Sequence, residues 1–151
     1  MILIDPSAGT HVVGSRFGRL ITTYRAREGD DYPHSVVGKL HFADDWLLAN
    51  LKGDVQDYYA WYVKQKFGIK LHVRSLWGAH VSVIRGEQIK KNQHTWGKRE
   101  GELITMKYTH NIYTNGEHWW LNVECEELAN IRGHYGLGTN KKWFHLTIGR
   151  L

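Results

Sequence analysis

The sequence predicts an α+β fold with mostly antiparallel sheet. Strand-like runs rich in β-branched and aromatic residues recur along the chain, whereas only residues 54–67 form a long segment with apolar residues at helical spacing. The dipeptide Asn115-Gly116 lies between two such runs, as in β-hairpins. The chain has 151 residues and no linker-like tract, so we expect a single domain over residues 1–151.

The first strand-like segments are residues 11–25, which are rich in Val, Ile, Thr and Tyr, and residues 36–42. Residues 28–33 between them carry a glycine, paired aspartates and a proline, and these favour a loop.

Two helices are expected next. Asp44 or Asp45 is suited to cap a short helix that Gly53 ends, and Asp54 is suited to cap a second helix that Gly68 ends. The short helix would carry Trp46, Leu47, Leu48 and Leu51, and the second would carry Val55, Tyr58, Tyr59, Tyr62, Val63 and Phe67. We expect the aromatic stripe of the second helix to pack against a sheet.

The second half of the chain returns to strands. We expect strands over residues 71–84, 103–113, 119–123 and 142–150, with loops at 86–101 and 136–140. The pair Asn115-Gly116 predicts a hairpin because both residue types accept positive φ. A short helix is expected over residues 125–131, closed by Gly133.

Composition limits the classes of function. The net charge of +5 and pI near 9.3 favour anionic partners such as nucleotides or RNA, and seven Trp and eight Tyr supply rings that stack on bases or fill a core. Cys125 is the only cysteine, which excludes an intramolecular disulfide and a zinc site built on several cysteines. We find no membrane-spanning apolar run and no secretory signal, so we expect a cytoplasmic protein with no membrane partner.

Two short segments of the chain resemble each other. Residues 80–85 read HVSVIR and residues 145–150 read HLTIGR; each has His, an apolar residue, a hydroxyl residue and then Arg five positions after the His. Alternate residues of a strand point to one face, so His80 would project with Ser82, and His145 with Thr147.

The quartet of two histidines and two hydroxyl residues suits the cleavage of a phosphodiester if the two strands lie side by side. One neutral imidazole takes a proton from the attacking hydroxyl, and the other, protonated, gives one to the leaving oxygen. The hydroxyls donate hydrogen bonds to phosphate oxygens as charge develops. This chemistry needs neither a metal nor another cofactor.

The two motifs resemble those of the two-histidine (2H) phosphoesterase superfamily. This superfamily includes RNA-end cyclic phosphodiesterases, 2′-5′ RNA ligase-like proteins and phage enzymes that destroy cyclic oligonucleotide signals. The resemblance implies a bilobal fold with mostly antiparallel sheets around a central cleft and flanking helices. It also implies that His80 and His145 are the acid and base, that Ser82 and Thr147 bind phosphate, and that a phage-encoded member would work in the host cytoplasm.

The chain departs from the superfamily in two respects. Ser82 replaces the commoner Thr, and only four residues follow Thr147. One hypothesis is a circular permutation, in which residues 11–42 supply elements that usually come last and pack beside the motif strands.

Further candidate substrate-binding residues are Trp77, Arg85, Tyr108, Trp143 and Arg150. Trp143 shares the face of His145, whereas each Arg falls at odd spacing and would face away unless a bulge turned it. A metal site joining His110 and His118 across the hairpin is conceivable, but spacing supplies no third ligand. Two other functions stay open: a non-catalytic nucleotide- or RNA-binding module, and a Trp-rich β protein that binds sugars or another protein.

Overall fold

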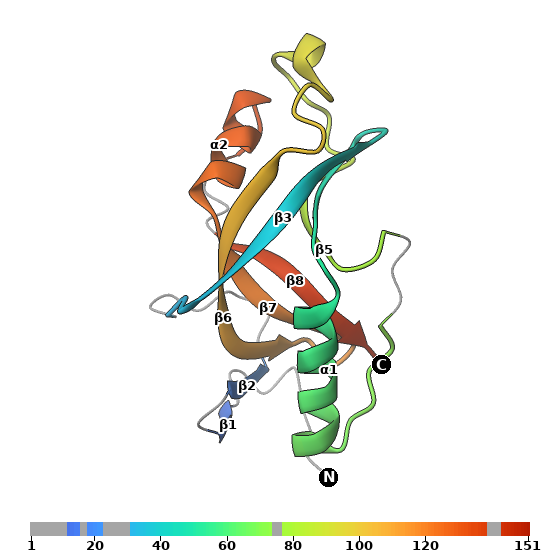
Figure 1. Ribbon diagram of the computed structural model, residues 1–151, viewed down its shortest axis with the longest axis vertical. Helices are drawn as coiled ribbons and strands as arrows, with labels where there is room; N and C mark the ends of the chain where they lie inside the picture. The colour runs from blue at the N-terminus through green and yellow to red at the C-terminus, as the bar shows by residue number, and fades with distance from the viewer. Residues whose placement is uncertain (1–11, 16–17, 23–30, 74–76, 139–142) are drawn as a thin grey trace.

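The computed structural model describes residues 12–15, 18–22, 31–73, 77–138 and 143–151 (Figure 1). Its elements, in chain order, are β1 (Val12–Ser15), β2 (Gly18–Thr22), β3 (His34–Ala43), β4 (Trp46–Asn50), α1 (Asp54–Phe67), β5 (His80–Arg85), a 3-10 helix η2 (Gln93–Thr95), β6 (Leu103–Thr114), β7 (His118–Glu124), α2 (Glu126–His134) and β8 (Trp143–Arg150). These elements confirm the α+β class.

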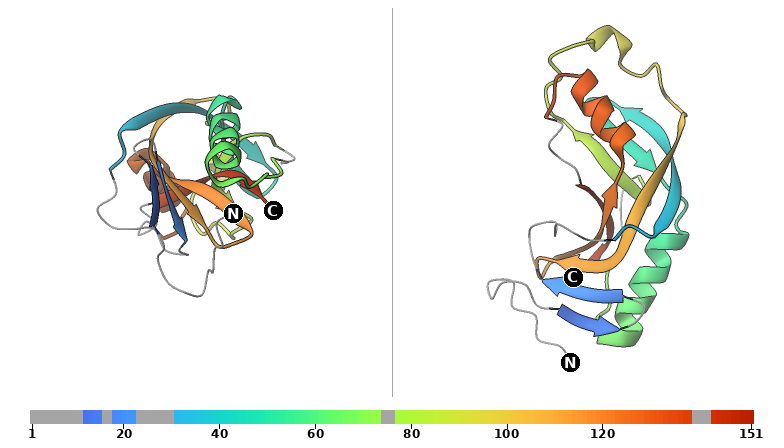
Figure 2. Two further views of the ribbon diagram at one scale, coloured as in Figure 1. Left: turned by 90° about the horizontal axis from the view of Figure 1, so that it is seen from below. Right: turned by 90° about the vertical axis from the view of Figure 1, so that its left-hand side faces the viewer.

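Six of the strands close into an antiparallel barrel. Their order is β6-β3-β4-β5-β8-β7, and β7 pairs with β6 to complete the ring. The view from below in Figure 2 shows these strands curving round in a ring. The β1–β2 hairpin extends the sheet beyond the barrel, because β2 pairs in parallel with the end of β6.

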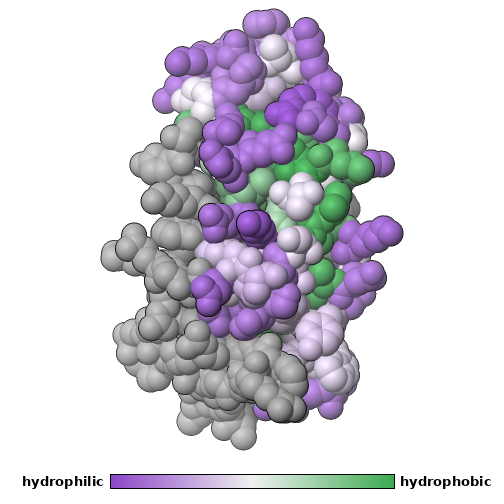
Figure 3. Space-filling model, turned by 60° about the vertical axis from the view of Figure 1, so that its left-hand side comes forward, coloured by the Kyte–Doolittle hydropathy of each residue, from purple (hydrophilic) through white to green (hydrophobic). Residues whose placement is uncertain are grey.

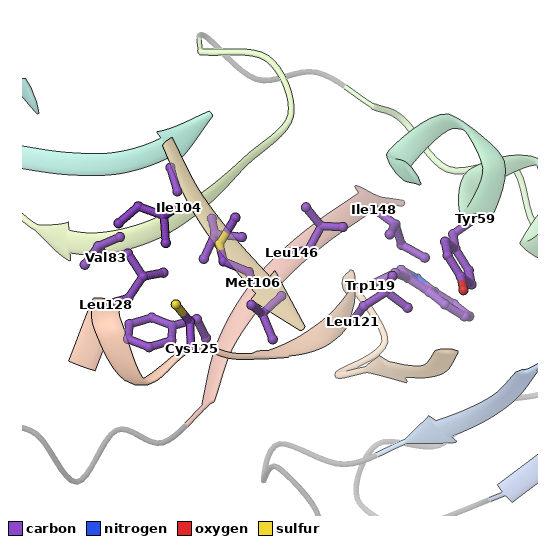
Figure 4. Packing of buried hydrophobic residues seen from close by; sticks show 14 of the residues in the cluster. Tyr59, Val83, Ile104, Met106, Trp119, Leu121, Cys125, Leu128, Leu146 and Ile148 are labelled. Atoms are coloured by element: carbon purple, nitrogen blue, oxygen red, sulfur yellow. The ribbon is translucent and has the colours of Figure 1, made fainter. Parts of the chain in front are cut away.

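The barrel interior is a filled hydrophobic core. Leu121, Leu146 and Met106 are fully buried in its middle, with side chains of α2 and α1 toward opposite ends (Figure 4). At the α2 end the core includes Val83, Ile104, Cys125 and Leu128; at the α1 end it includes Tyr59, Trp119 and Ile148. Small barrels are filled by inward side chains in this way, so a ligand has to bind outside the interior.

The prediction of a short helix after Asp44 or Asp45 is wrong, because Trp46–Asn50 is strand β4. Asp44 adopts a left-handed φ of 53° in the turn that joins β3 to β4. Leu47 and Leu48 are both fully buried. A short apolar run buried on both faces cannot be distinguished from a helical turn by its spacing.

The second helix is confirmed over residues 54–67, and its apolar stripe packs on the core as expected, except for Tyr58, which is 48% exposed. The residue at its N-cap is Gly53, not Asp54, and no side chain caps it. Gly68 ends the helix in the left-handed conformation, with φ of 68°. Gly133, expected to close the later helix, lies within α2, which ends at His134.

The Asn115-Gly116 hairpin is confirmed, although for a different conformational reason. Only Gly116 has positive φ, while the Asn115 side chain accepts hydrogen bonds from the backbone amides of Glu117 and His118. The final strand is also confirmed, as β8. The segment 11–25 contains two strands rather than one. Residues 28–30 of the loop expected at 28–33 lie outside the described residues, and residues 31–33 belong to neither a helix nor a strand.

Residues 11–42 flank the motif strands less closely than the permutation hypothesis requires. Among the described strands, β1 pairs with β2, β2 pairs with β6, and β3 pairs with β6 and β4. The strand that lies beside β5 is β4. The pairing therefore gives that hypothesis no support.

The loop at residues 86–101 and its 3-10 helix form the upper end of the molecule, which is hydrophilic on the face drawn in Figure 3. Within the described residues, no helix is long and apolar enough to cross a membrane.

Candidate active site on the outer face of the barrel

The two sequence motifs lie on neighbouring antiparallel strands. Val81 on β5 lies directly opposite Leu146 on β8. Continuing this register by one residue sets His80 opposite Thr147, and Ser82 opposite His145. Val81–Leu146 is the one backbone pairing between the described residues of β5 and β8. Extended from this pair, the register sets each histidine near the hydroxyl residue of the other motif, with the four side chains on one face.

That face is the outside of the barrel. Val81 and Leu146 are fully buried in the core, so their neighbours in each strand point outward. His80 and Ser82 are half-buried, whereas His145 and Thr147 are exposed. The histidines are diagonal neighbours, a position in which residues lie about 7–8 Å apart with their Cβ atoms somewhat closer, and a phosphate group fits between two imidazoles at this spacing.

A β-bulge follows the hydroxyl residue in each motif. In β5, Leu48 pairs with Ser82 but Leu47 with Ile84, so Val83 is the extra residue. In β8, Trp120 pairs with Thr147 but Trp119 with Gly149, so Ile148 is the extra residue. An extra residue reverses the alternation of side chains beyond it.

These bulges bring both arginines onto the outer face. Arg85 pairs with Trp46 and Arg150 pairs with His118, and both guanidinium groups are exposed. The two motifs run in opposite directions, so one arginine lies beyond each end of the histidine–hydroxyl group. The outer face therefore presents a cation on either side of the quartet.

An aromatic wall connects Arg85 with His80. The Arg85 guanidinium lies 5.7 Å from the centre of the Trp46 ring, and Trp46 stacks on Trp77 at 5.5 Å. Trp77 in turn meets His80 edge-on at 6.2 Å. The predicted residue Trp77 is therefore brought to the site, with an aromatic neighbour that the sequence did not point to.

The imidazole of His80 is oriented by the backbone. Its Nδ1 donates a hydrogen bond to the carbonyl oxygen of Gly78 at 2.8 Å. A carbonyl oxygen only accepts, so Nδ1 carries a proton and Nε2 carries the lone pair when the ring is neutral.

The imidazole of His145 lies on a stack of aromatic rings. It stacks on Trp120 with ring centres 4.9 Å apart and planes 28° apart, and Trp120 stacks on Tyr113 at 6.2 Å. The Trp120 indole Nε1 donates to Oδ1 of Asn122 at 3.2 Å. The pair Tyr113 and Trp120 is buried apart from the main core.

Two asparagines complete the site, and sequence reasoning missed both. Asn50 lies opposite His80 on β4, and Asn122 lies opposite His145 on β7. The Oδ1 atom of Asn50 and the Nδ2 atom of Asn122 are buried, and neither has a hydrogen-bond partner among the residues that the structure describes. Asparagine is disfavoured in strands, so Asn122 within the expected strand 119–123 was an available signal, whereas Asn50 fell in a run expected to be helical.

Helix α1 contacts the site strand from its other side. Gln56 donates a hydrogen bond from Nε2 to the backbone oxygen of Thr147 at 2.9 Å. Gly149 allows the segment before β5 to approach β8 closely, because a Cβ there would lie 2.7 Å from Cβ of Leu71. The backbone around Thr147 is thus held from two directions.

Some predicted residues lie elsewhere. Tyr108 stacks on His34 at 5.0 Å and lines a cavity of about 510 Å³ between β6 and α1, away from the histidine pair. Burial raises the pKa of its hydroxyl. Trp143 begins β8, but its side chain lies outside the described residues.

The histidines considered for a metal site do not meet. His110 is hydrogen-bonded to His34 at 3.1 Å, whereas His118 lies opposite Arg150 in the pairing of β7 with β8. In the part of the chain that the structure describes, no three His, Cys, Asp or Glu side chains are grouped so as to hold a metal ion.

The arrangement offers two proton-transfer groups, two hydroxyl donors and two cations on one accessible face. Compared with models of known families, with curated proteins and with solved structures, the chain matches none.

Proposed function

We propose that this protein is a metal-independent phosphodiesterase of the 2H phosphoesterase type that acts on an RNA-like phosphate. The observation that carries the proposal is the register of β5 and β8, which sets each histidine opposite the hydroxyl residue of the other motif. Two unrelated histidines on a surface would have no reason to share this reciprocal arrangement.

In the proposed reaction the substrate phosphate lies between His80 and His145. One imidazole takes the proton of the attacking oxygen as the new P–O bond forms, and the other protonates the leaving oxygen as its P–O bond breaks. Ser82 and Thr147 donate hydrogen bonds to the non-bridging oxygens, where negative charge increases.

The substrate class follows from the surroundings of the pair. The cations Arg85 and Arg150 suit an anion that extends beyond one phosphate, and the wall of Trp46 and Trp77 offers rings for a base to stack on. The candidates are a cyclic oligonucleotide messenger, a 2′,3′-cyclic phosphate, and a 2′-5′ or 3′-5′ linkage. With a ribose 2′-hydroxyl as the attacking group, the product is a cyclic phosphate, and destruction of immune messengers by a phage protein is one such role.

The test is a substrate panel in the presence of excess chelator. It contains 2′,3′-cyclic nucleotides, short 2′-5′ and 3′-5′ RNAs, and cyclic di- and trinucleotides, with products identified by mass spectrometry. We expect cleavage of at least one member that survives the chelator and disappears in the double variant His80→Ala/His145→Ala. Cleavage abolished by the chelator would contradict metal independence, and binding without cleavage would favour a nucleotide-binding module.

The arginines give a separate prediction about salt. Arg85→Ala and Arg150→Ala should each raise KM several-fold with little change in kcat, because they act on a distant part of the anion. With a single-stranded RNA as substrate, each should also reduce the slope of log KM against log salt concentration by about 0.7, the value for one lost phosphate contact on a single strand. Arg99→Ala, which removes a half-buried arginine paired with Glu127 of α2, is the control. Equal effects of all three variants would contradict the assignment of Arg85 and Arg150 to the site.

A further inference from the structure

We propose that Trp120, held in place by Asn122, is a positioning residue that makes His145 the proton donor and leaves His80 as the proton acceptor. This inference rests on the proposed phosphodiesterase activity. It concerns how two chemically identical side chains take different roles.

The surroundings of His80 favour the role of acceptor. Gly78 holds the Nδ1 proton through its carbonyl oxygen, so the neutral ring presents a lone pair at Nε2. The neighbouring Trp77 ring meets His80 edge-on rather than lying parallel beneath it.

The surroundings of His145 favour its protonated form. Its ring lies nearly parallel to the Trp120 indole, and the negative face of an indole attracts a cation more strongly than that of the other aromatic residues. An imidazolium bound in this way keeps the proton that a leaving oxygen requires.

The side chain of Trp120 is held in a fixed position beneath the His145 ring. Its side chain is only 6% exposed, Tyr113 stacks on it, and its Nε1 proton is accepted by Oδ1 of Asn122. Asn122 is itself fully buried, so the hydrogen bond sets the plane of the indole and with it the position of His145.

Charged groups around His145 act in both directions. On the outer face, β5 carries His80 and Arg85, β7 carries His118 and Glu124, and β8 carries Arg150, while Lys107 of β6 lies opposite Glu124. Glu124 is the acidic group among these described residues, and it is a diagonal neighbour of His145. The Glu124 carboxylate thus lies beside the proposed donor. Helix α1, which packs on β8, carries two further acidic groups in its first turn, Asp54 and Asp57.

The proposed step balances without any further reactant. The attacking oxygen forms a bond to phosphorus and loses its proton to Nε2 of His80. The bond from phosphorus to the leaving oxygen breaks, that oxygen keeps the electron pair, and the proton comes from His145.

The two roles can be separated with a substrate in which a sulfur atom replaces the leaving oxygen. A thiolate leaves without being protonated, so a dinucleotide with sulfur in place of the bridging 5′ oxygen needs no acid. We expect His145→Ala to recover most of its lost kcat on this substrate, and His80→Ala to stay impaired. Recovery by His80→Ala instead would overturn the assignment. If the wild type cleaves neither this dinucleotide nor any substrate in the panel, the proposed function itself has failed.

The role of Trp120 is read from the pH profile of kcat. The fall in kcat at high pH, the high-pH limb of the profile, reports loss of the proton from the donor. In Trp120→Leu this limb should move to lower pH by about half a unit, because the interaction of an exposed cation with an indole face stabilises the cation by about 0.5–1 kcal/mol. The low-pH limb, which reports the acceptor, should stay in place. Trp120→Phe should shift the limb less, because it keeps a ring.

The matched control is Trp119→Leu, which removes the adjacent indole from the core face of the same strand. It should lower the melting temperature and leave both limbs unchanged. Asn122→Ala should move the high-pH limb in the same direction as Trp120→Leu. Asn122→Asp keeps an acceptor for the indole and adds a carboxylate opposite His145, so it should move the limb the other way. A Trp120→Leu profile identical to the wild type, or one that Trp119→Leu reproduces, would overturn the proposal.

Discussion

Replacing either histidine of the pair by alanine should lower kcat by about 10²–10⁴-fold, the usual contribution of a general acid or base. His80 and His145 each supply one proton transfer, and the reaction needs both. Substrate affinity should change by no more than a few-fold, because Ser82, Thr147 and the two arginines remain to bind the phosphate. The measurement is single-turnover cleavage of the best panel substrate, with binding measured separately at equilibrium.

The double variant sharpens this prediction. Residues that act in one step are not additive, so His80→Ala/His145→Ala should be little slower than the slower single variant. His94→Ala is the matched control, since His94 is an exposed histidine of η2 at the far end of the barrel. Multiplicative losses in the double variant, or an equal loss in His94→Ala, would contradict a shared site.

The residues of the quartet could be predicted from the sequence, but their surroundings could not. Alternation along a strand places His80 with Ser82, and the repeated pattern identifies His145 and Thr147 as their counterpart. The position of Arg85 depends on a bulge, which is a property of the pairing between β4 and β5 and not of either strand alone. Asn50 and Asn122 reach the site in the same way, through neighbours distant in sequence.

The fold shows the same division between local and non-local information. Helix α1 was predictable because its apolar spacing spans 14 residues and Gly68 ends it. Strand β4 was not, because so short and mostly apolar a strand of five residues obtains its conformation from the strands on either side. Closure of the barrel by β6 and β7 likewise depends on pairings that no single segment encodes.

The largest loss of stability is expected from Arg132, a buried residue of α2. Its guanidinium makes two hydrogen bonds to the Glu87 carboxylate, each 2.7 Å long, and donates to the backbone oxygens of Val83 at 2.8 Å and Gly138 at 3.1 Å. Arg132→Met leaves these acceptors without their donor. Since Glu87 is 38% exposed and regains some water, we expect the free energy of unfolding to fall by about 3 kcal/mol, the low end for breaking a buried pair.

The matched control is Arg99→Met, because Arg99 also pairs with carboxylates, those of Glu102 and Glu127, but at the surface. It should cost at most about 1 kcal/mol in the same urea titration. Equal costs for the two variants would contradict the prediction.

Arg132 also holds the backbone of the bulge that turns Arg85 outward, because Val83 is the extra residue of that bulge. Lysine keeps the charge but lacks the planar fork that bonds Glu87 and Val83 together. Arg132→Lys should therefore retain much of the stability and yet raise KM as Arg85→Ala does. It should also reduce the slope of log KM against log salt concentration. A stable Arg132→Lys protein with unchanged KM would show that the bulge keeps its shape without the guanidinium, since the position of Arg85 would then depend on strand pairing alone.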